Sequence, residues 1–469
     1  MAESLWRRRR AALARRRRPL DVVDLTNDSA FTLALLDDTW AWRHRLVEEL
    51  DLGSSDHVEV TSSYQLEFPP ELVAPYIGDR NARYVKALIP ITTREKRPLL
   101  RFSVSGPGFS QAHLIRRGAI AAISADYLSR LVASSPAKAE AAAGLDPKLL
   151  EALCITTPAI FREFVANHAT PSEALAAYLS DGLSVPIDAR TAARWAEQQA
   201  DVGATIAAAL REPPDGCSSS EQVVLALPRL EPRPRSVAEV DAVLLRYRHA
   251  VLAAAQARDR SLLVALGDYG RRYELILEIE APLDEPFTVK MSEQRALGLQ
   301  RRGWTYQRSG LRDARGYHFE ARVNDHSMEI AAFTVHDSAG LPVGIPPLEA
   351  ARFTSESLAL YSSDPERPST IVIGLRLRPT TDVRVTLAFV AVLAWMAVAA
   401  AVIITPEDQN NLVDALNLLT VPTTFAVALV LFRESTSLAA RLQRWGRVVL
   451  GIAIALLWTI ELGRLIIQV

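Results

Sequence analysis

Side chains that could bind a metal ion gather in one part of the sequence, a β-rich stretch in its last third. They are His318, Glu320, Asp325, His326 and His336. Alternation along a strand puts His318 and Glu320 on one face, which we expect to meet solvent. A zinc site needs three or four such groups to converge, and isolated histidines on alternating strands are a common surface feature. The sequence therefore predicts no metal site and no cofactor.

Nucleophilic catalysis has equally little support. Cys154 and Cys217 lie far apart without a C-x-x-C pair or a partner signature, and no G-x-S-x-G motif occurs. We interpret Asp37-Asp38 as a solvated segment that leads into a helix rather than as a pair of metal ligands. No catalytic residue is predicted, and we expect a protein that is not an enzyme, with an enzyme whose site has no sequence signature as an alternative.

One glycine-rich turn could in principle hold a phosphate group. It runs from Gly106 to Gln111, after a predicted strand and before a predicted helix. Gln111 stands where a dinucleotide-binding motif has its third glycine, and Pro107 removes one amide from the cradle. A plain turn with Ser110 as the helix N-cap is the preferred interpretation.

The last part of the chain contains long apolar segments. Val385 to Ile404 has about 20 residues without a charge, enough to cross a bilayer core of about 30 Å. Ala415 to Phe432 and Val448 to Ile467 follow, the latter interrupted by two charges. We expect transmembrane helices at 385–404, 412–432 and 447–467.

Four polar side chains would lie within or near these spans: Asp414, Asn417, Glu461 and Arg464. Arg464 could pair with Asp414 or Glu461 inside the bundle. The alternative is that these charges extend to the outer interface, as charges near helix ends readily do.

Basic residues suggest an orientation. Arg376, Arg378 and Arg384 precede the first predicted span, and four arginines fill the loop between the second and third. The first loop is acidic. Because basic residues collect on the cytoplasmic side, we expect a multi-pass protein of the plasma membrane with a cytoplasmic N-terminal region and the C-terminus outside.

The N-terminus is a basic arm, residues 1–19. Its arginines form two runs of four: Arg7, Arg8, Arg9, Arg10 and Arg15, Arg16, Arg17, Arg18. Contact with anionic lipid headgroups and a solvated tail are both open interpretations. Nucleic acid is not an expected partner, because the net charge of the chain is −1 and no groove-reading pattern accompanies the arginines.

Between the arm and the spans, two lobes are expected on either side of a linker at 212–221, which is rich in proline, glycine and serine. The first lobe, 20–211, combines a helix at Thr39 to Leu50, a small sheet and a helical part. Its predicted strands are His57 to Phe68, Tyr84 to Thr92 and Leu99 to Val104.

The second lobe, 222–380, contains a strand at Val223 to Leu227, a helix from a Ser236 capping box to about Arg258, and a β-sandwich-like part. Its strands are expected at Tyr273 to Glu280, Phe287 to Met291, Tyr317 to Val323, Met328 to His336 and Thr370 to Leu377.

Several of these stretches, Tyr84 to Val104, Ala281-Pro282, Tyr317 to Glu320 and Leu375 to Pro379, resemble a group of uncharacterised actinobacterial-type membrane proteins. Those proteins join a cytoplasmic β-rich region to a few C-terminal transmembrane helices. The resemblance implies the same architecture and carries no activity.

The expected fold is therefore an α+β cytoplasmic region, a small β-sheet plus helical lobe and then a β-sandwich-like lobe, followed by three transmembrane helices. The expected function is a membrane-anchored cytoplasmic interaction or sensing module without catalytic activity, which binds the lipid bilayer and an unidentified cytoplasmic protein. An alternative is an effector that forms homo-oligomers and perturbs the bilayer on a cytoplasmic signal.

Overall fold

The structure is a computed structural model, and it describes most of the chain between residues 22 and 403. The described residues are 22–53, 57–78, 82–96, 100–107, 112–157, 161–210, 219–296, 299–300, 303–309, 314–324, 328–337, 350–363 and 370–403, together with Ile452, Leu456 and Thr459. The basic arm therefore lies outside the described residues.

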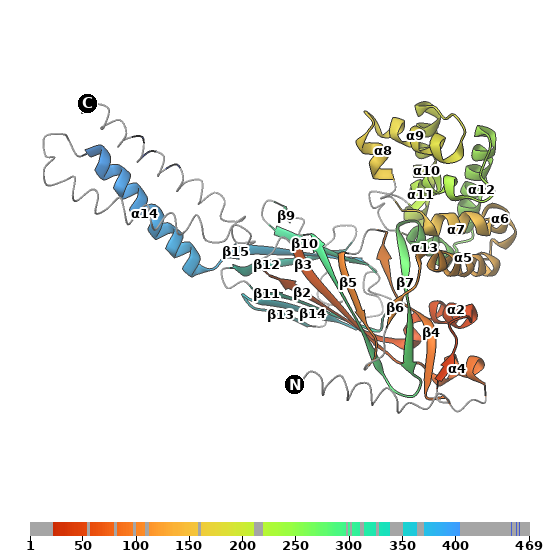
Figure 1. Cartoon of the computed structure of the whole chain (residues 1–469), viewed down its shortest axis with the longest axis horizontal. Coiled ribbons are helices and arrows are strands. Elements are labelled where there is room, and N and C mark those ends of the chain that lie inside the picture. Colours follow the sequence, from red (N-terminus) through yellow and green to blue (C-terminus); the bar gives the residue numbers. More distant parts are fainter. Residues whose placement is uncertain are drawn as a thin grey trace, which may run out of the picture.

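Three sheets make up an elongated β body (Figure 1). The largest contains, in spatial order, β13 (Ala350–Phe353), β14 (Ser357–Ser362), β11 (Gly316–Val323), β2 (Arg43–Leu52), β3 (His57–Leu66), β8 (Phe287–Ala296) and β5 (Leu100–Ser105). A second consists of β1 (Val22–Asp24), β4 (Tyr84–Glu95), β7 (Arg272–Pro282) and β6 (His113–Leu114). The third consists of β12 (Met328–Asp337), β15 (Thr370–Pro379), β10 (Gly303–Ser309) and β9 (Leu299–Gln300).

Strands from both ends of the sequence pair within these sheets. Strand β2 runs parallel to β11, with Leu46 opposite Tyr317, and β3 is antiparallel to β8. Strand β4 is likewise antiparallel to β7. The predicted fold class, with a small sheet in one lobe and a sandwich-like unit in the next, is therefore wrong. Alternating apolar positions identify a strand, but they do not say which strand lies beside it.

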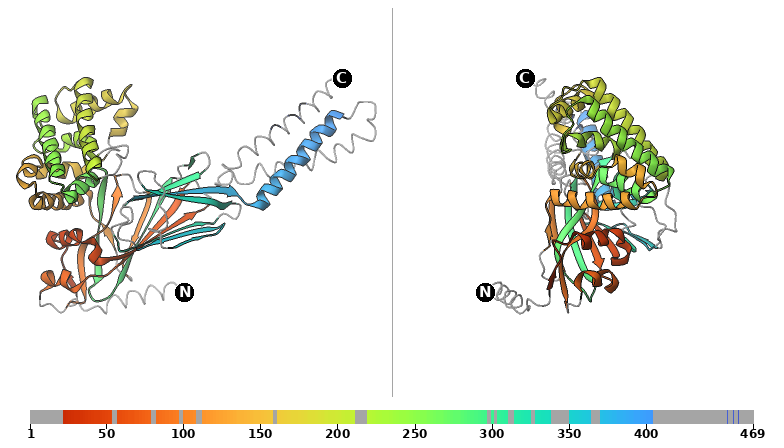
Figure 2. Two further views of the ribbon diagram at one scale, coloured as in Figure 1. Left: turned by 180° about the vertical axis from the view of Figure 1, so that it is seen from behind. Right: turned by 90° about the vertical axis from the view of Figure 1, so that its right-hand side faces the viewer.

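The helical lobe is inserted between β6 and β7, and it sits at one end of the β body (Figures 1 and 2). Its helices are α5 (Arg117–Ser134), α6 (Lys138–Gly144), α7 (Pro147–Ile155), α8 (Arg162–Ala166), α9 (Pro171–Leu183), α10 (Ala189–Leu210), α11 (Ser219–Ala226), the 3-10 turn η2 (Leu227–Arg229), α12 (Val237–Gln256) and α13 (Arg260–Arg271). Its core is separate from that of the β body and includes Trp195, Tyr247 and Leu179.

Capping side chains mark the starts of two helices in this lobe. Thr170 and Glu173 form the reciprocal capping box at the start of α9. Ser236 accepts from the amide of Glu239 at the start of α12, while the Glu239 carboxylate accepts from the amide of Arg235. The strand predicted at Val223 to Leu227 is wrong, because Val223 to Ala226 belong to helix α11.

Three short helices lie in the N-terminal part of the chain: α2 (Ser29–Asp37), which packs against β4, α3 (Thr39–Trp42), which contacts β2, and α4 (Pro70–Ile77), which packs against α2. The helix expected from Thr39 to Leu50 is wrong, because it ends at Trp42 and strand β2 begins at Arg43. Helices α2 and α5 cover part of β7, where Ile276 packs with Leu33 and Ile120.

At the opposite end of the β body, β15 leads through Thr380 into helix α14 (Thr381–Ile403) (Figure 1). Arg384 in its first turn lies 3.7 Å from Glu329 of β12. Helix α14 exposes apolar side chains, among them Val385, Phe389 and Met396.

Within the described ranges, no helix combines the length and the apolar character that a membrane crossing requires. The predictions of a transmembrane helix at 385–404, of a multi-pass membrane protein, and of a plasma-membrane location with the N-terminal region cytoplasmic are corrected accordingly. The segments predicted to span at 412–432 and 447–467 lie almost wholly outside the described residues.

Two of the arginines from which the orientation was predicted belong to the β body. Arg376 and Arg378 lie within strand β15, and Arg378 donates to Glu329 at 2.6 Å. These two arginines therefore take part in the β body.

Candidate functional site

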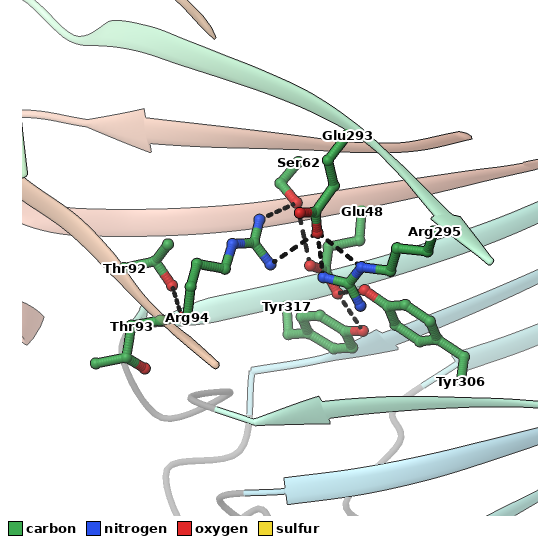
Figure 3. A network of polar contacts seen from close by, with 9 residues as sticks. All are labelled: Glu48, Ser62, Thr92, Thr93, Arg94, Glu293, Arg295, Tyr306 and Tyr317. Atoms are coloured by element: carbon green, nitrogen blue, oxygen red, sulfur yellow. Dashed lines mark hydrogen bonds and ion pairs between the residues drawn. The ribbon is translucent and has the colours of Figure 1, made fainter. Parts of the chain in front are cut away.

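The most extensive group of buried polar side chains lies where the three sheets meet (Figure 3). We call it the buried polar network, and its members are Glu48, Ser62, Arg94, Glu293, Arg295, Tyr306 and Tyr317. Four strands of the largest sheet contribute residues, while Arg94 comes from β4 and Tyr306 from β10. A polar connection therefore joins all three sheets.

Glu48 is fully buried and accepts hydrogen bonds from several hydroxyl groups. Tyr306 and Tyr317 both donate to its Oε2 atom at 3.1 Å, and Ser62 Oγ donates to Oε1 at 3.2 Å. A buried carboxylate is costly unless its oxygens are satisfied in this way. Since Glu48 is 0% exposed, this arrangement fits a role in holding strands together rather than contact with a substrate.

Two arginines and two glutamates balance the charge of the network. Arg94 Nη1 lies 3.7 Å from Glu293 Oε1, and Arg295 Nε donates to the same oxygen at 2.7 Å. Arg94 Nη2 also donates to Ser62 Oγ at 3.1 Å. The guanidinium carbon of Arg295 lies 5.3 Å from the ring centroid of Tyr306, within the range of a cation–π contact.

The environment keeps Arg295 charged. Burial disfavours its charge, but Tyr306, Glu293 and Glu48 together raise the pKa of the guanidinium above its usual value. Breaking a buried ion pair by removing one partner is strongly destabilising. Removal of one member of the network should therefore weaken the packing of the three sheets.

Two residues beyond Arg94, Lys96 links β4 to the helical lobe. The residue is 5% exposed, and its amine donates to the carbonyl of Leu153 in the last turn of α7 at 2.6 Å. Carbonyl groups at a helix C-terminus lack partners within the helix, and a buried amine that donates there satisfies one of them. Lys96 therefore ties the end of α7 to the strand that carries Arg94.

Burial lowers the pKa of the Lys96 amine to about 7, which is close to neutral pH. The neighbouring Cys154 thiol behaves in the opposite way, because burial raises its pKa to about 12. A thiol with such a pKa remains protonated and is a poor nucleophile. Nearby, Tyr269 donates to Glu274 at 2.9 Å, and both side chains are buried.

The helical lobe also has an open groove of about 440 Å³ between α6 and α12. Glu140, Arg246 and His249 supply its polar lining, and Gly144 forms part of its floor. A Cβ atom on Gly144 would lie 2.2 Å from the Arg246 carbonyl oxygen. The close approach of the two helices therefore depends on this glycine.

Of the residues considered for metal binding, those that the structure describes do not converge. His318 accepts from Arg45 at 2.8 Å, Glu320 accepts from Arg322 at 2.7 Å, and His336 lies on a strand of another sheet. Asp325 and His326 lie outside the described residues. Among the residues that the structure describes, no group of three potential ligands comes together.

Other predicted site residues are not placed. The arginines of the basic arm and the polar residues Asp414, Asn417, Glu461 and Arg464 all lie outside the described residues. Sequence reasoning did not identify the buried polar network, although a signal for it exists. Glu48 has the same strand phase as the buried Leu46 and Leu50, and a charged residue in such a position requires partners.

Comparison with protein-family models, with curated proteins and with solved structures gave no match. The site therefore has to be interpreted from its own geometry.

Proposed function

We propose that this chain is a non-catalytic interaction or sensing module, in which the helical lobe receives a partner and the β body conveys its effect to the opposite end. The observation that carries the proposal is the polar connection that begins at the helical lobe and reaches β10. Strand β10 pairs with β15, with Tyr306 opposite Ile373, and β15 leads directly into α14.

Each step of this connection is either one hydrogen bond or two residues along the chain. Lys96, the residue after the end of β4, donates to the end of α7, and Arg94 lies two residues before it in β4. Ser62 joins Arg94 to Glu48. Tyr306 then donates to Glu48. Packed polar groups of this kind can carry energetic coupling between distant parts of a protein. Mutations along the connection measure that coupling.

The groove between α6 and α12 supports the helical lobe as the receiving end. It combines charged groups with apolar side chains such as Leu252 and Ala253, a mixture found at the edges of protein interfaces. Catalysis has less support, because Glu48 is inaccessible and Lys96 acts as a helix cap.

Hydrogen exchange of the full chain tests the proposal. Replacing Lys96 with Met should speed amide exchange near α7 and also in β10 and β15, because loss of the cap loosens the connected strands. The control is Lys148→Met, which removes an exposed pair with Glu151 in the same helix. Changes confined to α7 and β4 would contradict the proposal.

A further inference from the structure

The second sheet has an acidic surface at the end where the chain enters it. Asp24, Lys86 and Glu280 occupy one row across β1, β4 and β7. Residues directly opposite one another in neighbouring strands share a face of the sheet. Glu278, two residues from Glu280, shares this face and lies 2.5 Å from the Lys86 amine. Three carboxylates therefore surround one lysine.

A pocket of about 340 Å³ adjoins this row. Its lining includes two carboxylates, Glu280 and Glu285, and the ring of Tyr84. Pro282 and Phe287 supply apolar walls. Carboxylates beside an aromatic ring suit a guanidinium group, which can bond to the former and stack on the latter.

The basic arm joins the sheet beside this pocket. Val22, the first described residue, lies opposite Tyr84 in a parallel pair, and Tyr84 lies opposite Pro282 on its other side. Because β1 runs parallel to β4, the chain before Val22 approaches from the end at which Tyr84, Pro282 and Glu285 lie. The pocket and the attachment point of the arm are thus at the same end of the sheet.

The arm is long enough to reach the pocket. Arg18 is four residues before Val22 and Arg15 is seven. At about 3.3 Å per extended residue, these arginines can lie up to roughly 13 to 23 Å from Val22. Neighbouring strands are only about 4.8 Å apart, so the pocket lies within reach of the second arginine run.

We infer that the basic arm docks on its own chain, with arginines of the run Arg15 to Arg18 seated in the pocket formed by Tyr84, Glu280 and Glu285. This inference does not rest on the proposed function. The docked arm would shield the acidic face and keep its own arginines from other anionic partners, a lipid surface included.

Limited trypsin digestion of the full chain tests the inference, since trypsin cleaves after arginine. Early cleavage within residues 7–17 is followed by mass spectrometry at low salt. The double variant Glu280→Gln/Glu285→Gln should lose the arm several-fold faster than the wild-type chain. The control Glu197→Gln/Glu356→Gln removes two exposed carboxylates elsewhere and should leave the cleavage rate unchanged.

Two further measurements keep the test decisive. Glu285→Gln alone alters an exposed residue, so faster cleavage in that variant cannot reflect loss of the fold. Raising the salt concentration should speed cleavage of the wild-type arm to the rate of the double variant, because salt screens exposed charges. Equal cleavage of all variants at low salt would overturn the inference.

Vesicles that contain phosphatidylserine test the competing hypothesis that the arm binds anionic lipid. If the wild-type arm is cleaved as fast as that of the double variant, and only such vesicles protect it, the arm binds anionic lipid rather than its own chain. That result would also overturn the inference.

Discussion

Arg94 of β4 and Glu293 of β8 approach to 3.7 Å between Nη1 and Oε1, with 6% of each side chain exposed. This contact joins two sheets whose strands do not hydrogen-bond to each other. Because a charge that stays buried after losing its partner is costly, replacing either residue should weaken the packing of the two sheets. Arg94 is therefore a suitable position at which to test whether the buried polar network holds the sheets together.

Replacing Arg94 with Met should destabilise the fold. The change removes the donor to Ser62 and one cation beside Glu293, while Arg295 remains. We expect a loss of about 2–3 kcal/mol in the free energy of unfolding, somewhat less than a fully orphaned buried charge would cost. Chemical denaturation measures this loss.

The matched control is Arg322→Met, because Arg322 forms an ion pair with Glu320 and has a side chain that is 60% exposed. Exposed pairs contribute at most about 1 kcal/mol. If the two variants lost equal stability, the Arg94 contact would have no special structural role.

The Lys96 amine should make stability depend on pH. Its pKa is about 7 in the folded chain, against 10.5 for an ordinary lysine side chain, which we take for the unfolded chain. Between those values the unfolded state binds more protons, so the free energy of unfolding should rise as pH increases from about 7 toward 10.

Comparison with Lys96→Met isolates this contribution, since the variant has no amine to titrate. The wild-type chain should gain stability relative to the variant between about pH 7 and about pH 9.5, measured by urea denaturation at each pH. If the wild-type chain gained no stability relative to the variant over this range, Lys96 would titrate normally in the fold.

Gly144 should be intolerant of a side chain. Alanine there would bring a Cβ within 2.2 Å of the Arg246 carbonyl oxygen and force α6 from α12, at a cost of roughly 1–3 kcal/mol. Gly118→Ala in α5 is the control, because no atom lies within 4 Å of its added Cβ. A glycine-to-alanine change in a helix is otherwise stabilising by up to about 1 kcal/mol, so the thermal midpoints should move in opposite directions.

The positions of many strands could be predicted from the sequence, since alternation and β-branched residues mark them locally. Strand β8 and strand β15 begin where expected, at Phe287 and Thr370. Their partners could not be predicted. The parallel pair of β2 and β11 joins segments about 270 residues apart, and no local periodicity encodes such a pairing.

The error at Thr39 to Leu50 has a specific cause. Trp42 at the end of α3 and Leu46 and Leu50 in β2 follow one another at intervals of four residues. A spacing of four suits one face of a strand as well as one face of a helix. All three are buried in the structure. The true period is two, and it also places Glu48 on the buried face, where the helical interpretation concealed it.

Other members of the candidate site follow the same rule. Glu293 and Arg295 continue the buried alternation of Phe287, Val289 and Met291 along β8. Polar residues at those alternating positions of a strand that are otherwise apolar were thus the signal for the buried polar network. Their mutual contacts depend on how three sheets pack, which the sequence alone does not specify.

A double-mutant cycle tests the central claim of coupling through the β body most directly. Free energies of unfolding are measured for the wild-type chain, Lys96→Met, Tyr306→Phe and the double variant. The proposed connection predicts that the two changes are non-additive, with an interaction energy of about 1 kcal/mol, whereas independent sites add to within about 0.5 kcal/mol. The control pair Lys148→Met and Tyr306→Phe should be additive. Additivity in both cycles would contradict coupling between the helical lobe and β10.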